Sequence, residues 1–248
     1  MAHVLDTEEL LLRLASATTE LNVYRLNITS LPELPVGLRA LDCSHTQLTS
    51  LPELPTGLRT LVCYNTQLTS LPELPAGLQK LDCYNTQLTS LPELPTGLHT
   101  LYCHNTQITS LPELPAGLQI LICYNTQLTS LPQLPAGLHT LDCHNTQLTS
   151  LPELPVGLRK LNCSHTQLTS LPELPIGLKI LDCRNTPLIL KIKKDESIAE
   201  YNLRWNLWRE EQASKQRIQE KNRIWKEGIM MDVYHPRRVE KKSKYVWG

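Results

Sequence analysis

The sequence predicts a solenoid with short parallel strands on its concave face, an extended convex side and a helix at either end. Two observations lead to this fold class. A pattern of 20 residues, L-x-x-L-x-C-x-x-T-x-L-T-S-L-P-E-L-P-x-G, recurs with small changes in eight units, the first at Leu38 and the last at Leu178. Inward and outward positions alternate at the start of each unit as in a strand, and the paired prolines then exclude a helix.

The repeat array covers residues 18–190. A degenerate unit precedes the full ones, with Leu21, Val23 and Ile28 at places where leucine, cysteine and leucine recur. Stacked units are expected to share one continuous leucine core, because a single unit cannot bury its own leucines. The prolines fix φ, so the convex side is expected to be extended, polyproline-like chain. The glycine that ends each unit, such as Gly57, is expected to turn the chain at positive φ.

The strand segment joined to L-P-E-L-P resembles the leucine-rich repeats of secreted bacterial effectors of the Yop and Ipa group, and similar arrays occur in proteins of large DNA viruses. The resemblance covers residues 18–190. Two features differ from that family. The ninth position holds Thr, as in Thr46, where the family has Asn, and Asn stands one place earlier, as in Asn65. A threonine hydroxyl can bond to neighbouring backbone, so we expect the turn to be kept but built differently.

The second difference concerns the ubiquitin-ligase domain that follows the array in effectors of the Ipa type. That domain carries a nucleophilic cysteine, and no cysteine follows Cys183 in this chain. The ligase activity is therefore not implied here. No other combination of acid, base, nucleophile or phosphate loop is apparent, so the chain is predicted not to be an enzyme.

Each full unit carries one cysteine, from Cys43 to Cys183. The sixth position alternates inward with the leucines, so each sulfur is expected to act as a small, inert core group. Disulfides fit less well, because side chains on neighbouring parallel strands run side by side rather than toward one another. Ligands along a line cannot surround a zinc ion, and no C-x-x-C occurs. We therefore expect neither a metal nor another cofactor.

Function is expected at the outward positions of the strands, where the units differ. Aromatic and aliphatic side chains gather there in the middle of the array. A patch of this kind with charged residues around it is typical of protein-binding surfaces, although the β-propensity of tyrosine and isoleucine alone would also place them in strands. The candidate partner-binding residues on the concave face are Tyr64, Tyr84, Tyr102, His104, Ile122, Tyr124 and His144.

The N-terminal segment, residues 1–17, is predicted to form a helical cap. A short helix is expected over residues 6–17, with Asp6 as N-cap and Glu9 three residues later. Its leucines would then face the first unit and cover the open end of the core. The segment lacks the basic start of a signal peptide, and no run in the chain reaches the roughly 20 apolar residues of a membrane span. We therefore expect a cytoplasmic location, in a host cell if the chain is an effector or a viral protein.

The C-terminal tail, residues 191–248, is basic and contains every tryptophan of the chain, the last being Trp247. Residues 195–226 lack glycine and proline and are predicted to be helical. A stripe at helical spacing is expected to dock on the last repeat, and its members are Ile198, Tyr201, Trp205 and Trp208.

The chain is thus predicted to be a non-enzymatic scaffold that binds another protein through its concave face. The alternative is a regulatory or tethering protein that acts through the basic C-terminal helix on a calmodulin-like or nucleic-acid partner. Ile218, Gln219 and Arg223 form half of a calmodulin-binding pattern. The whole chain has 24 basic and 24 acidic side chains, and the modest basic excess of the tail argues against nucleic acid.

Overall fold

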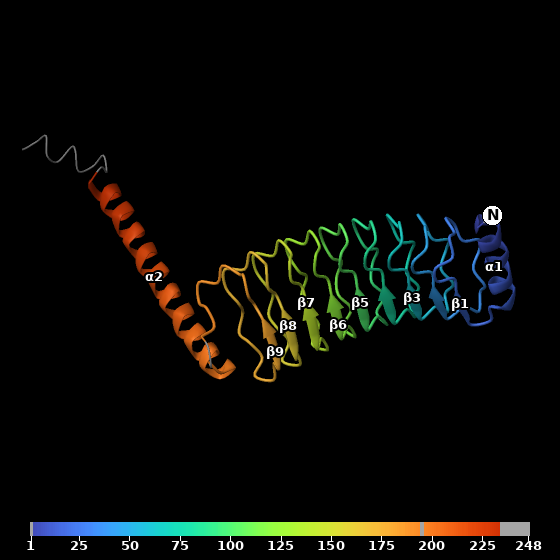
Figure 1. The fold of residues 1–248 in the computed structure, drawn as a ribbon. Coiled ribbons are helices and arrows are strands. Elements are labelled where there is room, and N and C mark those ends of the chain that lie inside the picture. The colour runs from blue at the N-terminus through green and yellow to red at the C-terminus, as the bar shows by residue number, and fades with distance from the viewer. Residues whose placement is uncertain (1, 194–195, 234–248) are drawn as a thin grey trace, which may run out of the picture. The chain divides into compact units, whose positions relative to one another are not determined.

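The computed structural model describes residues 2–193 and 196–233. Within them, nine parallel strands of three residues each form one sheet in chain order (Figure 1). The predicted leucine-rich-repeat solenoid, with a helix before and a helix after it, is confirmed. The strands are β1 (Glu20–Asn22), β2 (Ala40–Asp42), β3 (Thr60–Val62), β4 (Lys80–Asp82), β5 (Thr100–Tyr102), β6 (Ile120–Ile122), β7 (Thr140–Asp142), β8 (Lys160–Asn162) and β9 (Ile180–Asp182).

The register of the sheet equals the repeat period. Leu41 pairs with Leu61 and Leu61 with Leu81, so each residue faces its equivalent 20 places later. Equivalent side chains therefore form columns along the array. The inward columns are the leucines and the cysteines, and from β2 to β8 their members at the first, fourth, sixth and eleventh positions are all buried. The repetition in the sequence thus becomes one continuous core, as predicted.

The turns differ from the prediction in the place of the residue with positive φ. The chain does turn at Gly57 before the next strand, but no glycine in the part of the chain that the structure describes has a positive φ, so the positive φ expected at Gly57 is wrong. The left-handed residue is at the eighth position, as in Asn65 with φ 54°. Asparagine tolerates this conformation because its short polar side chain can hydrogen-bond locally. Some glycines instead make room for the preceding unit: a Cβ on Gly97 would lie 3.2 Å from the carbonyl oxygen of Ala76.

The threonine at the ninth position completes the turn. The hydroxyl of Thr66 donates to the carbonyl oxygen of Cys63 at 2.8 Å, and the same bond recurs in every full unit. This side chain is buried, so the bond satisfies a polar group inside the turn. The expectation that threonine keeps the turn through a backbone hydrogen bond is confirmed.

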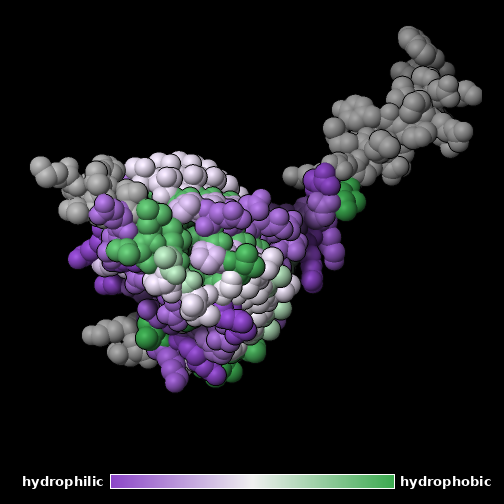
Figure 2. Space-filling view, turned by 90° about the vertical axis from the view of Figure 1, so that its right-hand side faces the viewer, coloured by the Kyte–Doolittle hydropathy of each residue, from purple (hydrophilic) through white to green (hydrophobic). Residues whose placement is uncertain are grey.

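The N-terminal helix α1 (Ala2–Ser16) lies against β1 at the first end of the array (Figure 1). It begins at Ala2, so Asp6 is inside the helix and is not its N-cap. The residues before Asp6 include no helix breaker that would stop it from starting earlier. Leu10 is buried, and the Arg13 guanidinium donates to the carbonyl oxygen of Asn22 at 2.7 Å. Figure 2 looks onto this end and shows hydrophobic surface among hydrophilic side chains.

The C-terminal helix α2 (Ile198–Val233) is 36 residues long and extends beyond the predicted end at residue 226. It lies almost entirely in a second compact unit that begins at Ala199. Ion pairs one turn apart, such as Lys215 with Glu211 at 2.7 Å, support it. Docking of its tryptophan stripe on the last repeat stays a prediction, and Trp247 lies outside the described residues. Neither described helix is long and apolar enough to cross a membrane.

Candidate functional site

The candidate site is the sheet face, which we define as the outward side chains at the third, fifth, seventh and eighth positions of the units. All seven predicted partner-binding residues lie on it, and each is half-buried. They fall into two neighbouring columns. Tyr102 and Ile122 are register partners in the fifth-position column, and the other five belong to the seventh-position column. The face therefore has a fifth-position column of charged, aromatic and aliphatic side chains beside a seventh-position column that contains the rings.

The five rings of the seventh-position column stack on one another, and we call this stack the ring ladder. The centroids of Tyr64 and Tyr84 are 4.4 Å apart with planes 6° from parallel. The next three pairs, up to His144, are each 4.3 Å apart. A strand spacing of about 4.8 Å places equivalent side chains within stacking distance. Because each inner ring has a neighbour on both faces, the ladder presents ring edges and hydroxyl groups outward.

Two rings in the middle of the ladder, His104 and Tyr84, are held in their neutral forms near neutral pH. Burial lowers the pKa of His104 to about 4, against an opposing effect of Asp142. Its Nδ1 atom is buried and has no hydrogen-bond partner among the described residues. Burial together with Tyr64 and Asp82 raises the pKa of Tyr84 to about 12. These two rings therefore offer polar edges without a charge.

Asp82 is the most buried charged side chain of the face, with 6 % of its surface exposed. Its Oδ2 lies 3.4 Å from the Lys80 ammonium, whereas its Oδ1 is buried without a partner in the described chain. Burial raises the pKa of this carboxyl, and Lys80 partly offsets the effect. The same ammonium lies 5.6 Å from the centroid of the Tyr102 ring. A cation is therefore held between a carboxylate and an aromatic ring.

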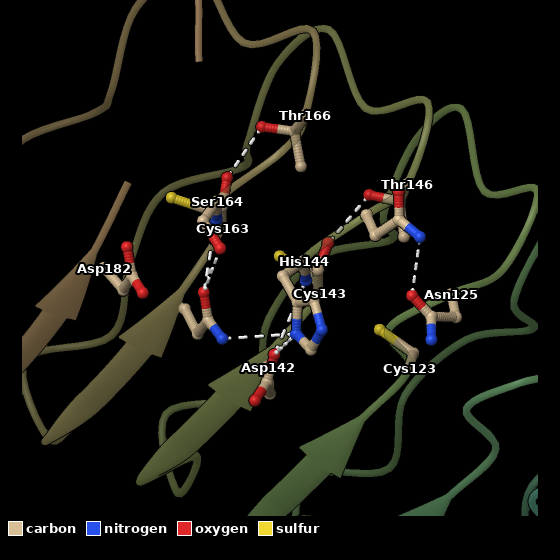
Figure 3. A network of polar contacts seen from close by, with 12 residues as sticks. Cys123, Asn125, Asp142, Cys143, His144, Thr146, Cys163, Ser164, Thr166 and Asp182 are labelled. Carbon is tan, nitrogen blue, oxygen red and sulfur yellow. Dashed lines mark hydrogen bonds and ion pairs between the residues drawn. The ribbon is translucent and has the colours of Figure 1, made fainter. Parts of the chain in front are cut away.

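A polar network surrounds Asp142 in β7, the strand that follows Tyr102 in β5 and Ile122 in β6 (Figure 3). His144 Nδ1 donates to Asp142 Oδ1 at 2.6 Å, and the side-chain amide of Asn162 lies 3.2 Å from the same nitrogen. The Asn162 oxygen in turn accepts from the hydroxyl of Ser164 at 2.9 Å. These contacts fix the end of the ring ladder and hold Asp142 in one orientation.

The left-handed asparagines form a second polar column beside the rings. The amide of Asn85 donates to the side-chain oxygen of Asn65 at 2.7 Å, and Asn145 donates to Asn125 at 2.6 Å. Figure 3 shows the latter bond at the edge of the network. Asn65 also donates to Nε2 of His45 at 3.0 Å, so the histidine at this position accepts as an asparagine would.

The cysteines lie on the opposite side of the strands, as predicted. Seven are buried with 0 % exposure, Cys183 is half-buried, and all eight are free thiols. Burial raises the pKa of Cys103 to about 12, so its thiol stays protonated and unreactive at neutral pH. Within the described ranges, no group of three or more histidine, cysteine or acidic side chains is arranged to hold a metal ion.

Sequence reasoning missed three features of this face: the stacking of the rings, the burial of Asp82 and the column of left-handed asparagines. The first had a readable signal, since aromatic residues occupy the seventh position in five consecutive units. The burial of Asp82 had no such signal, because it depends on the stacking of units, and its register partner Tyr102 comes from the next unit.

Comparison with known proteins gives a consistent result. The family model "Leucine Rich repeats (2 copies)" matches residues 76–116. A search of curated protein sequences returned no significant match. Among solved structures, YopM from Yersinia enterocolitica is 36 % identical with a TM-score of 0.69, over 72 % of this chain and 41 % of that one. The chain thus spans less than half the length of that relative.

Two further structures resemble the array. The leucine-rich-repeat domain of a Shigella effector is 32 % identical with a TM-score of 0.58, over 74 % of this chain and 78 % of that one. InlJ from Listeria monocytogenes is 25 % identical with a TM-score of 0.57, over 73 % of this chain and 46 % of that one. The InlJ domain is described as including a cysteine ladder.

Proposed function

Because this chain belongs to the leucine-rich-repeat family, we propose that it is a non-enzymatic scaffold that binds a partner protein on its sheet face. Proteins of this repeat type are protein-interaction scaffolds. YopM and the Shigella domain are effectors by name, so the proposed partner is a host or cellular protein and the proposed place of action is inside a cell. The identity of the partner is left to the experiment below.

The observation that carries this proposal is the pair Tyr102 and Ile122 in the middle of the face. Both side chains are half-exposed, adjacent in register and bordered by the ring ladder. Aromatic and aliphatic groups at the centre of a surface, with charges further out, are the usual composition of a binding hot spot. The fixed register and the stacked rings order these side chains before binding, so association costs little side-chain entropy.

The test replaces the central pair and leaves the ring ladder intact. The double variant Tyr102→Ser, Ile122→Ser is expected to lose most captured protein when tagged full-length chain is incubated with host-cell extract. The matched control is Val156→Ser, Ile176→Ser, which removes two apolar side chains that are 86 % and 84 % exposed at the end of the convex segment. Capture that is equal in both variants, with unchanged thermal unfolding, would contradict binding on the sheet face.

A second candidate function uses α2. The helix carries exposed apolar side chains among basic residues, and its first pair, Leu203 and Leu207, is one turn apart. This arrangement fits a tether that binds a partner groove. Deletion of residues 195–248 should abolish capture if the tail binds the partner. The scaffold proposal predicts instead that capture persists and that the array melts at a lower temperature.

A further inference from the structure

We propose that the sheet face binds an extended segment of its partner with the pattern basic–x–apolar–x–basic, laid across strands β4 to β7. This inference rests on the proposed function and adds the chemistry of the bound segment. It assigns one basic side chain to Asp82, the other to Asp142, and the apolar side chain to the space between Tyr102 and Ile122.

The four residues form one straight column. Asp82 pairs with Tyr102, Tyr102 with Ile122, and Ile122 with Asp142 in the register of the sheet. The two aspartates are buried, with 6 % and 8 % of their surfaces exposed, whereas the tyrosine and isoleucine between them are half-exposed. Tyr102 and Ile122, which we call the apolar step, thus lie between two carboxylates that are more deeply buried.

Asp82 shows an unmet need for a hydrogen-bond donor. Its Oδ1 is buried and has no hydrogen-bond partner among the described residues, and a buried carboxylate oxygen without a donor costs stability. A guanidinium from a partner has several donors in one plane and can satisfy such an oxygen. Lys80 marks where the cation belongs, since its ammonium already lies between Asp82 and the Tyr102 ring. An incoming arginine would displace this lysine and pair with the carboxylate in its place.

Asp142, unlike Asp82, is held in one orientation by hydrogen bonds. Its hydrogen bonds within the described part of the chain go to Oδ1, from the ring and the backbone nitrogen of His144. The side chain is thereby oriented, and Oδ2 is left to accept from a donor outside the chain.

The spacing of the column selects the pattern. Three strand steps of about 4.8 Å place the two aspartates roughly 14 Å apart. An extended chain rises about 3.4 Å per residue and directs every second side chain to the same side, so its residues i and i+4 are also roughly 14 Å apart. Residue i+2 then lies midway, over the apolar step. Basic residues two or three places apart would fail to reach both carboxylates.

The experiment measures binding of labelled synthetic nine-residue peptides to the full-length protein by fluorescence anisotropy. The parent peptide has arginine at its third and seventh places, leucine at the fifth and serine or glycine elsewhere. We expect it to bind at least tenfold more tightly than the peptide with glutamate in place of both arginines. A third peptide, with arginines only two places apart, is expected to bind several-fold more weakly than the parent.

Protein variants assign the contacts. Asp82→Asn and Asp142→Asn are each expected to weaken binding of the parent peptide about tenfold. The control Asp182→Asn removes an aspartate from the same position of a distant unit, where Arg184 already pairs with it at 2.8 Å, and should change nothing. Lys80→Met is expected to strengthen binding several-fold, because it removes the side chain that occupies the cation position.

Two results separate this inference from the proposed function. Peptide binding that Tyr102→Ser, Ile122→Ser abolishes but neither aspartate variant weakens would overturn the basic pattern and leave the scaffold intact. Equal binding of the arginine and glutamate peptides, or binding of neither, would also overturn it. The scaffold itself is judged separately, by capture of the partner protein with the central-pair variant and its convex control.

Discussion

Cys83 and Tyr84 are neighbours in the chain, yet they belong to two columns with opposite properties. The column of Cys83 is identical in every full unit and is buried over nearly its whole length. The column of Tyr84 changes from serine to tyrosine, histidine and arginine along the array. A register of one repeat turns the first into a uniform core and the second into a surface on which each place is distinct. We therefore expect function to depend on the side chains that vary beside the constant core.

The largest effect expected from this contrast is in the reactivity of the thiols. Seven cysteines are fully buried, so a small thiol reagent should label them at least about a hundredfold more slowly than a free thiol until the array opens. Cys183, which is half-buried, should react first. Mass spectrometry of the protein during labelling, with and without urea, measures both rates. Rapid native labelling of Cys103 or Cys123 would mean that the sixth position is not core.

The next prediction concerns the outward column and tests whether the ring ladder also stabilises the array. Tyr84→Ala removes a ring stacked on both sides, at 4.4 Å from Tyr64 and 4.3 Å from His104. We expect a loss of about 1–3 kcal/mol from two stacked pairs and their burial, measured by urea unfolding.

The matched variant for this prediction is Tyr102→Ala. Its ring lies on the same face but makes its cation–π contact with Lys80 and belongs to the other column. We expect it to lower the free energy of unfolding by less than half as much. Equal losses in the two variants would show that stacking along the ladder adds nothing beyond ordinary burial.

The sequence was sufficient for the features that follow from the repeat period. The inward place of the cysteines, the leucine core and the extended return all depend on alternation and on proline chemistry within a single unit. The start of α1 at Ala2 was missed because Asp6 is a good N-cap by type, while nothing in the residues before it prevents a helix.

Features that depend on neighbouring units were not predictable in the same way. A unit such as the one that begins at Leu78 contains both Lys80 and Asp82, but the ring that completes the cation site, Tyr102, comes from the next unit. The residue with positive φ was misassigned for a related reason. Glycine is the usual residue at positive φ. Here, however, glycines such as Gly97 lie close to a carbonyl oxygen of the preceding unit, and the positive φ is found at asparagine.

A smaller loss of stability is expected from substitutions at the residue with positive φ. Asn125 has a φ of 52°, and alanine in this conformation costs about 1–2 kcal/mol. Asn125→Ala should therefore destabilise by roughly that amount, whereas Asn125→Gly should lose less, since glycine adopts positive φ freely. Gln127→Ala, an exposed position in the same turn, serves as the control and should change stability by less than about 0.5 kcal/mol. Urea midpoints that do not separate the alanine and glycine variants would contradict a backbone cause.

The smallest expected effect is a dependence of the free energy of unfolding on pH that comes from His104 of the ring ladder. The pKa of His104 is about 4 in the folded protein, below the 6.5 or so of an unfolded chain. Between these values the unfolded state binds more protons, so the contribution of neutral His104 is complete above about pH 6.5 and is lost as the pH falls toward 4. Solvent screening at this half-buried ring keeps the effect below about 1 kcal/mol.

The variant His104→Gln isolates this contribution, because it removes the titrating group while the other histidines remain. Its lower absolute stability, caused by the lost stacking, does not matter to the comparison. The quantity to compare is the change in unfolding free energy between pH 7 and pH 4, and it should be smaller in the variant than in the native chain. Identical changes would mean that His104 is solvated well enough to titrate normally, and that the middle of the ladder is as open to water as its ends.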